Sequence, residues 1–162
     1  MTERSVAPQG MATSPVDLSN PSAALTAVLA FFEHIQAHDV SRLGTFYCDD
    51  AFFKDPFNEV RGLTAIQAIF AHMFEQLNEP RFVVRERMRQ GQRAFLTWDF
   101  VFRFKRYDTT TEQVIHGATY LEIDEQGKVT LHRDYWDAAE ELYEKLPVVG
   151  GVMRWLKARA RS

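Results

Sequence analysis

The spacing of hydrophobic residues changes once along the chain, near residue 81. Before that point they recur every three or four positions, which is the period of a helix with one buried face. After it they alternate with polar residues, which is the period of a β-strand. The chain therefore predicts helices first and a run of antiparallel strands second, an order typical of an α+β domain with helices on one face of a sheet.

Three helices are predicted in the first half of the chain. The first begins at Asn20-Pro21, an N-cap followed by proline in the first turn, and ends near His38. Asp39 caps a short second helix, and Gly62 opens a third. The apolar stripes of the three helices are Leu25, Val28, Leu29, Phe32 and Ile35; Val40, Leu43, Phe46 and Tyr47; and Ile66, Ile69, Phe70, Met73 and Leu77.

Strands are predicted at 82–88, 95–105, 114–123 and 128–137, after a short one at 51–54. The last two pair through the turn at 124–127. Within 95–105 the two faces differ, because successive side chains of a strand point to opposite sides. One face carries Trp98, Phe100, Phe102 and Phe104, and the other carries Thr97, Asp99, Val101 and Arg103.

The chain divides into three stretches. Residues 1–19 contain Pro, Ser and Thr without apolar periodicity and predict a disordered tail. Residues 20–137 form the α+β domain. Residues 138–162 predict an amphipathic, basic helical extension, and we expect its apolar side to pack on the domain or a partner subunit rather than on an anionic membrane.

Composition narrows the class of protein. The 162 residues, 46% hydrophobic and 25% charged, suit one ordinary domain, and a net charge of -3 gives no case for nucleic-acid binding. Cys48 is the sole cysteine, so an internal disulfide is excluded. Without a membrane span or signal-peptide pattern, the expected location is cytoplasmic. Thirteen Phe and three Trp suggest an aromatic-lined cavity.

The candidate chemistry centres on Asp55, which ends the short strand at 51–54. Proline follows it, so the strand cannot continue, and Phe52, Phe53 and Phe57 are its aromatic neighbours. A carboxylate partly removed from water is suited to moving protons. An aspartate before proline also commonly caps a turn, and both interpretations stay open.

The order of elements and the motif around Asp55 resemble the nuclear transport factor 2-like superfamily, in particular its ketosteroid isomerase and SnoaL-like cyclase branches. The resemblance covers residues 21–137. It implies a cone-shaped, curved antiparallel sheet wrapped by the three helices around a deep apolar pocket, a hydrophobic ligand and a homodimer formed through the outer sheet face. The motifs are Tyr47-Cys48-Asp49-Asp50-Ala51, Phe53-Lys54-Asp55-Pro56-Phe57, Gly62, Asp124-Glu125-Gln126-Gly127-Lys128-Val129 and Tyr135-Trp136.

The resemblance assigns Asp55 the place of the isomerase's general base. The isomerase also binds the enolate oxygen through a tyrosine and a protonated aspartate. Counting along this chain puts Phe31 and Thr119 at those positions, with Tyr47 as another phenol nearby. Because one such donor is worth about 3 kcal/mol of barrier, ordinary ketosteroid isomerisation is not expected.

The last strand offers other chemical groups. If Trp136 points inward, as its family counterpart does, alternation also turns His132 and Asp134 inward, beside Asp55. SnoaL-like cyclases are thought to use an acid near this strand end, which is either Asp134 or Asp137 here. A His–Asp pair can also simply satisfy its own hydrogen bonds.

Two other chemistries find no support in the sequence. The five histidines lack the spacing of a metal site, so no metal is expected. No cofactor is expected either, because general acid–base chemistry needs none. Epoxide hydrolases of the same fold use an Asp–Arg–Asp set, which Asp99 and Arg103 partly imitate. Both lie opposite the aromatic face of their strand, so we expect them outside the pocket.

Two hypotheses follow for the function. The first is an acid–base isomerase, cyclase or lyase acting on an apolar carbonyl compound. The second is a non-catalytic ligand-binding or dimerisation module, with the pocket open or filled by aromatic rings; an open cavity reaching Asp55 favours the first. The catalytic candidates are Asp55, His132 and Asp134, and the substrate-binding candidates are Phe31, Tyr47, Phe57, Trp98, Phe100, Thr119 and Trp136.

Overall fold

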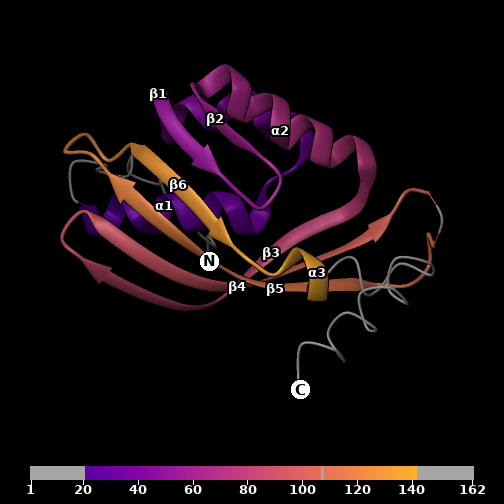
Figure 1. The fold of residues 1–162 in the computed structure, drawn as a ribbon. Coiled ribbons are helices and arrows are strands. Elements are labelled where there is room, and N and C mark those ends of the chain that lie inside the picture. Colours follow the sequence, from indigo (N-terminus) through magenta and orange to yellow (C-terminus); the bar gives the residue numbers. More distant parts are fainter. Residues whose placement is uncertain (1–20, 107, 142–162) are drawn as a thin grey trace, which may run out of the picture.

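The computed structural model describes residues 21–106 and 108–141 (Figure 1). The predicted disordered tail at 1–19 and most of the predicted extension at 138–162 lie outside the described residues. The predicted α+β class and order of elements are confirmed. The helices are α1 (Pro21–His34), the 3-10 helix η1 (Ala37–Thr45), α2 (Leu63–Gln76) and α3 (Ala138–Glu141). The strands are β1 (Tyr47–Lys54), β2 (Glu59–Arg61), β3 (Leu77–Gln90), β4 (Arg93–Phe104), β5 (Gln113–Ile123) and β6 (Val129–Tyr135).

The strands form one six-stranded sheet in the order β2-β1-β6-β5-β4-β3. The sheet is mixed, which corrects the expectation of an antiparallel sheet: β1 runs parallel to β6, while the other pairs are antiparallel. Parallel neighbours need a long crossover, and here the chain from α2 to β5 provides it. The three-residue strand β2, which the sequence did not predict, pairs with the end of β1.

The helices lie on the concave side of the curved sheet (Figure 1). Helix α2 contacts β1, β2 and β3, so it bridges strands from both edges of the sheet. The inward residues of β4 (Leu96, Trp98, Phe100 and Phe102) are buried together with Val28 and Leu29 of α1 and Ile66 and Phe70 of α2. This aromatic face of β4 is therefore the inner wall of the domain.

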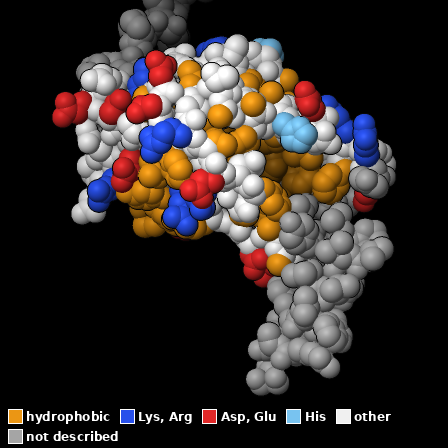
Figure 2. Space-filling model, turned by 45° about the horizontal axis from the view of Figure 1, so that its top comes forward, with side chains coloured by type: hydrophobic (Ala, Val, Ile, Leu, Met, Phe, Trp, Pro, Cys, Tyr) orange, Lys and Arg blue, Asp and Glu red, His pale blue; other side chains and the backbone are white. Residues whose placement is uncertain are grey.

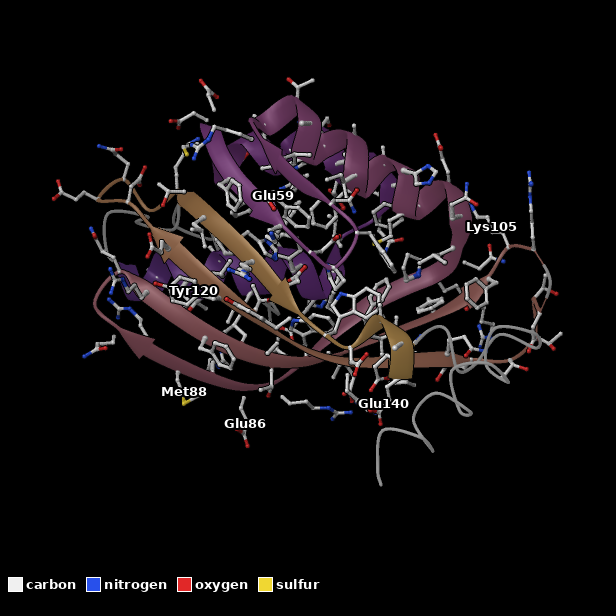
Figure 3. The ribbon with its side chains drawn as sticks, in the orientation of Figure 1. Glu59, Glu86, Met88, Lys105, Tyr120 and Glu140 are labelled. Carbon is white, nitrogen blue, oxygen red and sulfur yellow. The ribbon has the colours of Figure 1, made fainter. Side chains whose placement is uncertain are left out.

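The other face of the sheet carries charged side chains together with exposed apolar ones such as Met88. Glu86 and Met88 point away from the helices there (Figure 3). Asp99 accepts hydrogen bonds from Arg85 (Nε–Oδ2 2.8 Å) and contacts His116 (Nδ1–Oδ1 2.7 Å). The guanidinium of Arg85, followed by His116, lowers the pKa of the Asp99 carboxyl.

A glycine on β5 makes room for an aromatic ring of the inner wall. Gly117 pairs with Trp98 across the β4–β5 ladder, and the indole lies over the glycine. A Cβ atom at position 117 would overlap the indole ring. The position of the Trp98 ring therefore depends on residue 117 having no side chain.

We expect Gly117→Ala to lower the free energy of unfolding by about 1–3 kcal/mol, because overpacking forces the ring or the strand to move. Urea denaturation measures the loss, and near-UV circular dichroism reports the displaced tryptophan. The same substitution should cost much less in a Trp98→Leu background. Equal costs in the two backgrounds would contradict this explanation.

Candidate functional site

A cavity of about 500 Å³ lies between the inner face of the sheet and the helices. Its volume falls within the range of small-molecule sites, about 300–1,000 Å³. Figure 2 shows its opening as a hollow lined by hydrophobic side chains, with a histidine on the rim. The apolar lining includes Leu29, Phe32, Phe53, Ile69, Phe70, Met73, Phe82, Leu96, Trp98, Phe100, Phe102, Phe104, Ile115, Leu121 and Trp136.

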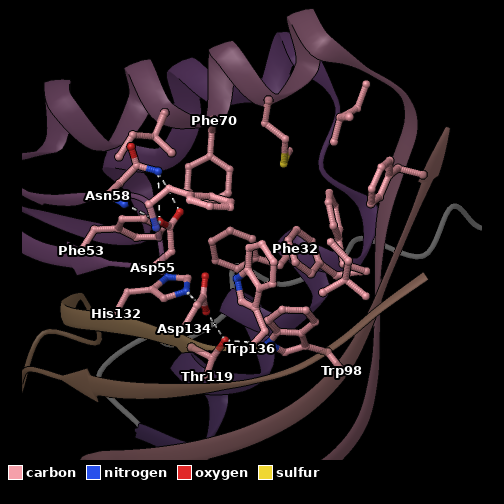
Figure 4. A pocket seen from close by; sticks show the side chains of 18 of the residues that line it. Phe32, Phe53, Asp55, Asn58, Phe70, Trp98, Thr119, His132, Asp134 and Trp136 are labelled. Atoms are coloured by element: carbon pink, nitrogen blue, oxygen red, sulfur yellow. Dashed lines mark hydrogen bonds and ion pairs between the residues drawn. The ribbon is translucent and has the colours of Figure 1, made fainter. Parts of the chain in front are cut away.

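The polar side chains of the lining gather at one end of the cavity (Figure 4). They are Asp55 and Asn58 from the β1–β2 loop, Thr119 from β5, and His132 and Asp134 from β6. His72 of α2 also lines the cavity, but its side chain is 71% exposed. None of the described lining residues is Arg or Lys.

Asp55 is held by donors from its own loop. Its Oδ1 accepts hydrogen bonds from the backbone N–H of Phe57 (2.7 Å) and Asn58 (2.6 Å). The Asn58 amide Nδ2 lies 3.0 Å from both carboxylate oxygens. This geometry is that of an Asx turn. The half-buried carboxylate thus caps the turn, as one interpretation expected, and it also borders the cavity.

A continuous chain of hydrogen bonds includes the other carboxylate of the cavity, that of Asp134. His132 is buried, with Nε2 2.9 Å from Asp134 Oδ1 and Nδ1 bonded to the Tyr47 hydroxyl. Asp134 Oδ1 also accepts a hydrogen bond from Thr119 Oγ1 (2.5 Å), which in turn accepts one from Trp98 Nε1 (2.7 Å). Figure 4 shows the bonds from Trp98 to His132 as dashed lines.

One set of proton positions satisfies this chain. Burial raises the pKa of the Tyr47 phenol well above its ordinary value, and the charge of Asp134 adds to the rise, so the phenol stays protonated. Tyr47 then donates to Nδ1 of His132, and Nε2–H donates to Asp134. Asp134 Oδ2 receives no hydrogen bond that the described residues show, so it is the open acceptor of the pair.

The structure brings most of the sequence-derived candidates together. The residues that line the cavity are Asp55, Phe57, Trp98, Phe100, Thr119, His132, Asp134 and Trp136. Phe57 and Trp136 meet edge to face, with ring centroids 5.3 Å apart. Asp137 caps α3 instead, because its Oδ1 accepts hydrogen bonds from the N–H groups of Ala139 and Glu140. Asp134 is therefore the acid of this strand end that faces the cavity.

Two candidates do not line the cavity. Phe31 packs against Phe46, with ring centroids 4.4 Å apart, and its neighbour Phe32 faces the cavity instead. Tyr47 is fully buried behind His132 and reaches the cavity only through that imidazole.

Sequence reasoning missed Asn58 and several aromatic residues of the lining. The Asp-Pro-Phe-Asn order could have indicated Asn58, because an Asx turn often pairs its first and fourth residues. Phe53 could have been found by alternation from Asp55. Asp99 and Arg103 lie outside the lining, as expected from their face of β4.

Within residues 21–106 and 108–141, no group of three or more His, Cys, Asp or Glu side chains could hold a metal ion. No described helix is long and apolar enough to cross a membrane.

Comparison with known proteins identifies the family. The SnoaL-like domain family matches residues 28–132, and the chain belongs to that family. No curated protein matches the sequence. The fold agrees with the nuclear transport factor 2-like cone inferred from the sequence.

Three solved structures illustrate the likeness in fold. A Catenulispora acidiphila protein with a ketosteroid isomerase-like fold, in complex with trimethylamine, is 18% identical over 74% of this chain and 88% of its own, with a TM-score of 0.63. A proposed SnoaL-like polyketide cyclase from Shewanella putrefaciens is 19% identical (75% and 95% covered, TM-score 0.62). An M. tuberculosis LEH-like epoxide hydrolase is 20% identical (85% and 94% covered, TM-score 0.61).

We expect Tyr47→Phe to lower the free energy of unfolding by about 1–3 kcal/mol at pH 7, because it leaves the buried Nδ1 of His132 without a donor. The folded-state pKa of Tyr47 is raised above its unfolded value of 10.0, so its stabilising contribution is complete below pH 10 and is lost as the pH rises further. The difference between wild type and variant should therefore shrink above pH 10.

Urea denaturation at several pH values from 7 to above 10 measures this difference. Tyr135→Phe, at a phenol that is 45% exposed, is the matched control and should change little. A constant difference between wild type and Tyr47→Phe across this range would contradict the assignment.

Proposed function

We propose that this protein is an acid–base enzyme that needs no cofactor and acts as an isomerase, cyclase or lyase on an apolar carbonyl compound. One observation carries the proposal: Asp55 and the Asp134–His132 pair border the same apolar cavity, and that cavity is open. A small-molecule site of this kind, with few polar groups in an apolar lining, is the usual setting for such chemistry.

In this proposal Asp55 is the base. It takes a proton from the carbon beside the carbonyl, and the electrons of the broken C–H bond move into the carbonyl to form an enolate. The backbone N–H groups of the turn hold the carboxylate in one orientation through successive proton transfers. The proton then goes back to a second carbon. Alternatively, the enolate carbon attacks a second carbonyl group of the substrate to close a ring, the π bond of that carbonyl breaks, and its oxygen takes the proton from Asp55. His132 and Asp134 assist as the second polar group of the site.

Standard ketosteroid isomerisation is not part of this proposal. Phe31 lies outside the cavity, and the Thr119 hydroxyl already donates its proton to Asp134. Epoxide hydrolysis through Asp99 and Arg103 has no support either, because neither residue lines the cavity. We also propose that the protein is a homodimer formed through the outer sheet face. We propose a cytoplasmic location, which the free Cys48 fits.

The test begins by finding a ligand. A thermal-shift screen of steroid, polyketide and terpenoid ketones detects binders, because ligand binding raises apparent stability by mass action. Each binder is then incubated with the protein in D2O, and mass spectrometry measures exchange of the hydrogens beside the carbonyl. We expect Asp55→Asn to slow this exchange by about 10²–10⁴-fold, the usual contribution of a general base.

The variant preserves the loop, because an asparagine Oδ1 still accepts the N–H groups of Phe57 and Asn58. Its thermal shift with the ligand should therefore persist. Asp99→Asn removes one carboxylate from the outer face and is the matched control. Unchanged exchange in Asp55→Asn removes Asp55 from the mechanism.

A non-catalytic binding module is the second candidate. It is favoured by the observation that Asp55 is already used as a turn cap, while the hydrogen-bonding groups of His132 and Thr119 are already engaged with other side chains. Binders that show no exchange above the uncatalysed rate would support this candidate and overturn the enzyme.

A further inference from the structure

The carboxyl groups of the cavity have no arginine or lysine partner among the described residues of its lining. These carboxyl groups belong to Asp55 and Asp134. The cations nearest in sequence to Asp55 are engaged elsewhere: Lys54 pairs with Glu59, and Arg61 donates to the Asp50 carbonyl oxygen. With the Tyr47 hydroxyl donating a hydrogen bond to Nδ1 of His132, the imidazole carries its single N–H at Nε2 and donates it to Asp134.

The hydrogen bonds at this end of the cavity leave an acceptor open to a ligand. Trp98 Nε1–H donates to Thr119, the Thr119 hydroxyl donates to Asp134, and His132 Nε2–H donates to Asp134. The two donors that reach Asp134 both bond to its Oδ1, so among the described residues the open acceptor is Asp134 Oδ2. A ligand that supplies a donor with positive charge complements this end of the cavity better than a ligand that supplies a carbonyl oxygen.

Aromatic rings surround the same carboxylates. The rings of Phe53 and His132 lie 4.9 Å apart, and Phe53 and Phe70 lie 5.9 Å apart. Trp98 and Trp136 border the cavity on the side of Asp134 (Figure 4). The faces of such rings attract cations, most strongly where water is excluded. Carboxylates within an aromatic lining form a suitable site for an organic ammonium group.

We propose that the cavity selects an apolar compound that carries a protonated amine, held against Asp134 Oδ2 and the surrounding aromatic rings. This inference rests on the proposed function for the cavity as the reaction site and narrows its substrate to an amine-bearing carbonyl compound. Asp55 remains the group that moves the proton. The help given by Asp134 and His132 then consists of holding the substrate.

Three rigid probes of the same shape test the charge preference. They are 1-adamantanamine, which is cationic at pH 7, 1-adamantanol, which is neutral, and 1-adamantanecarboxylate, which is anionic. Isothermal titration calorimetry on the full chain measures each affinity. We expect the amine to bind about ten- to a hundredfold more tightly than the alcohol, because it adds a charge-assisted hydrogen bond and cation–π contact. The carboxylate should bind most weakly.

Asp134→Asn tests the assigned acceptor. Its Oδ1 can still accept from Thr119 and His132, so the hydrogen-bond chain is kept while the charge at Oδ2 is lost. The variant should bind amine and alcohol about equally. Asp99→Asn is the matched control, because the side chains of Asp99 and Asp134 are each 14% exposed but only Asp134 lines the cavity. The control should keep the amine preference, and a thermal melt checks that each variant is folded.

The proposal is overturned if the alcohol or the carboxylate binds as tightly as the amine, if the amine does not bind, or if Asp134→Asn keeps the preference. Tight binding of the neutral ketone 2-adamantanone over the amine would indicate a protonated Asp134 that donates to a carbonyl. These results are independent of the exchange assay. Loss of the amine preference with exchange intact rejects only the substrate class, and absent exchange with the preference intact rejects only the enzyme.

Discussion

The site depends on a row of buried hydrogen bonds that crosses the sheet from strand to strand. Tyr47 belongs to β1, His132 and Asp134 to β6, Thr119 to β5 and Trp98 to β4, and these strands are successive neighbours. Each polar group in this apolar surrounding needs its partner, because an unpaired one would cost the full price of its desolvation. The row therefore requires one pairing register. A shift of one residue would turn Asp134 outward and break it at two places.

The helices and the sheet together keep the cavity from closing. Because α2 contacts strands at both edges, it holds the curved sheet around a space that the α1 and α2 side chains do not fill. Gly117 also helps to keep the cavity open, since it lets the large Trp98 ring lie against the sheet rather than project inward. Rigid aromatic walls of this kind favour a ligand that fits by shape, while the few polar groups at one end fix its orientation.

The sequence predicted the direction of side chains correctly where the two-residue period of a β-strand determined it. Alternation along 128–137 placed His132, Asp134 and Trp136 on one face, and the aromatic face of β4 followed from the same rule. The apolar stripe of the first helix likewise placed Phe32 inward, whereas counting along the chain to the isomerase's tyrosine position led to Phe31, which does not line the cavity. The parallel pairing of β1 with β6 had no local signal, since a period of two does not identify the neighbouring strand. The contact between Tyr47 and His132, 85 residues apart, lay beyond any spacing argument.

The two carboxyl groups of the cavity are anchored in different ways. Asp134 is fixed within a central strand by hydrogen bonds from Thr119 of the neighbouring strand β5 and from His132 of its own strand. Asp55 instead stands in a short hairpin whose second strand, Glu59–Arg61, pairs at the sheet edge. Insertions or substitutions between Lys54 and Glu59 can therefore change the direction of the Asp55 side chain while the central strands keep their register. In this architecture a single surface hairpin is the part most open to the engineering of new reactions.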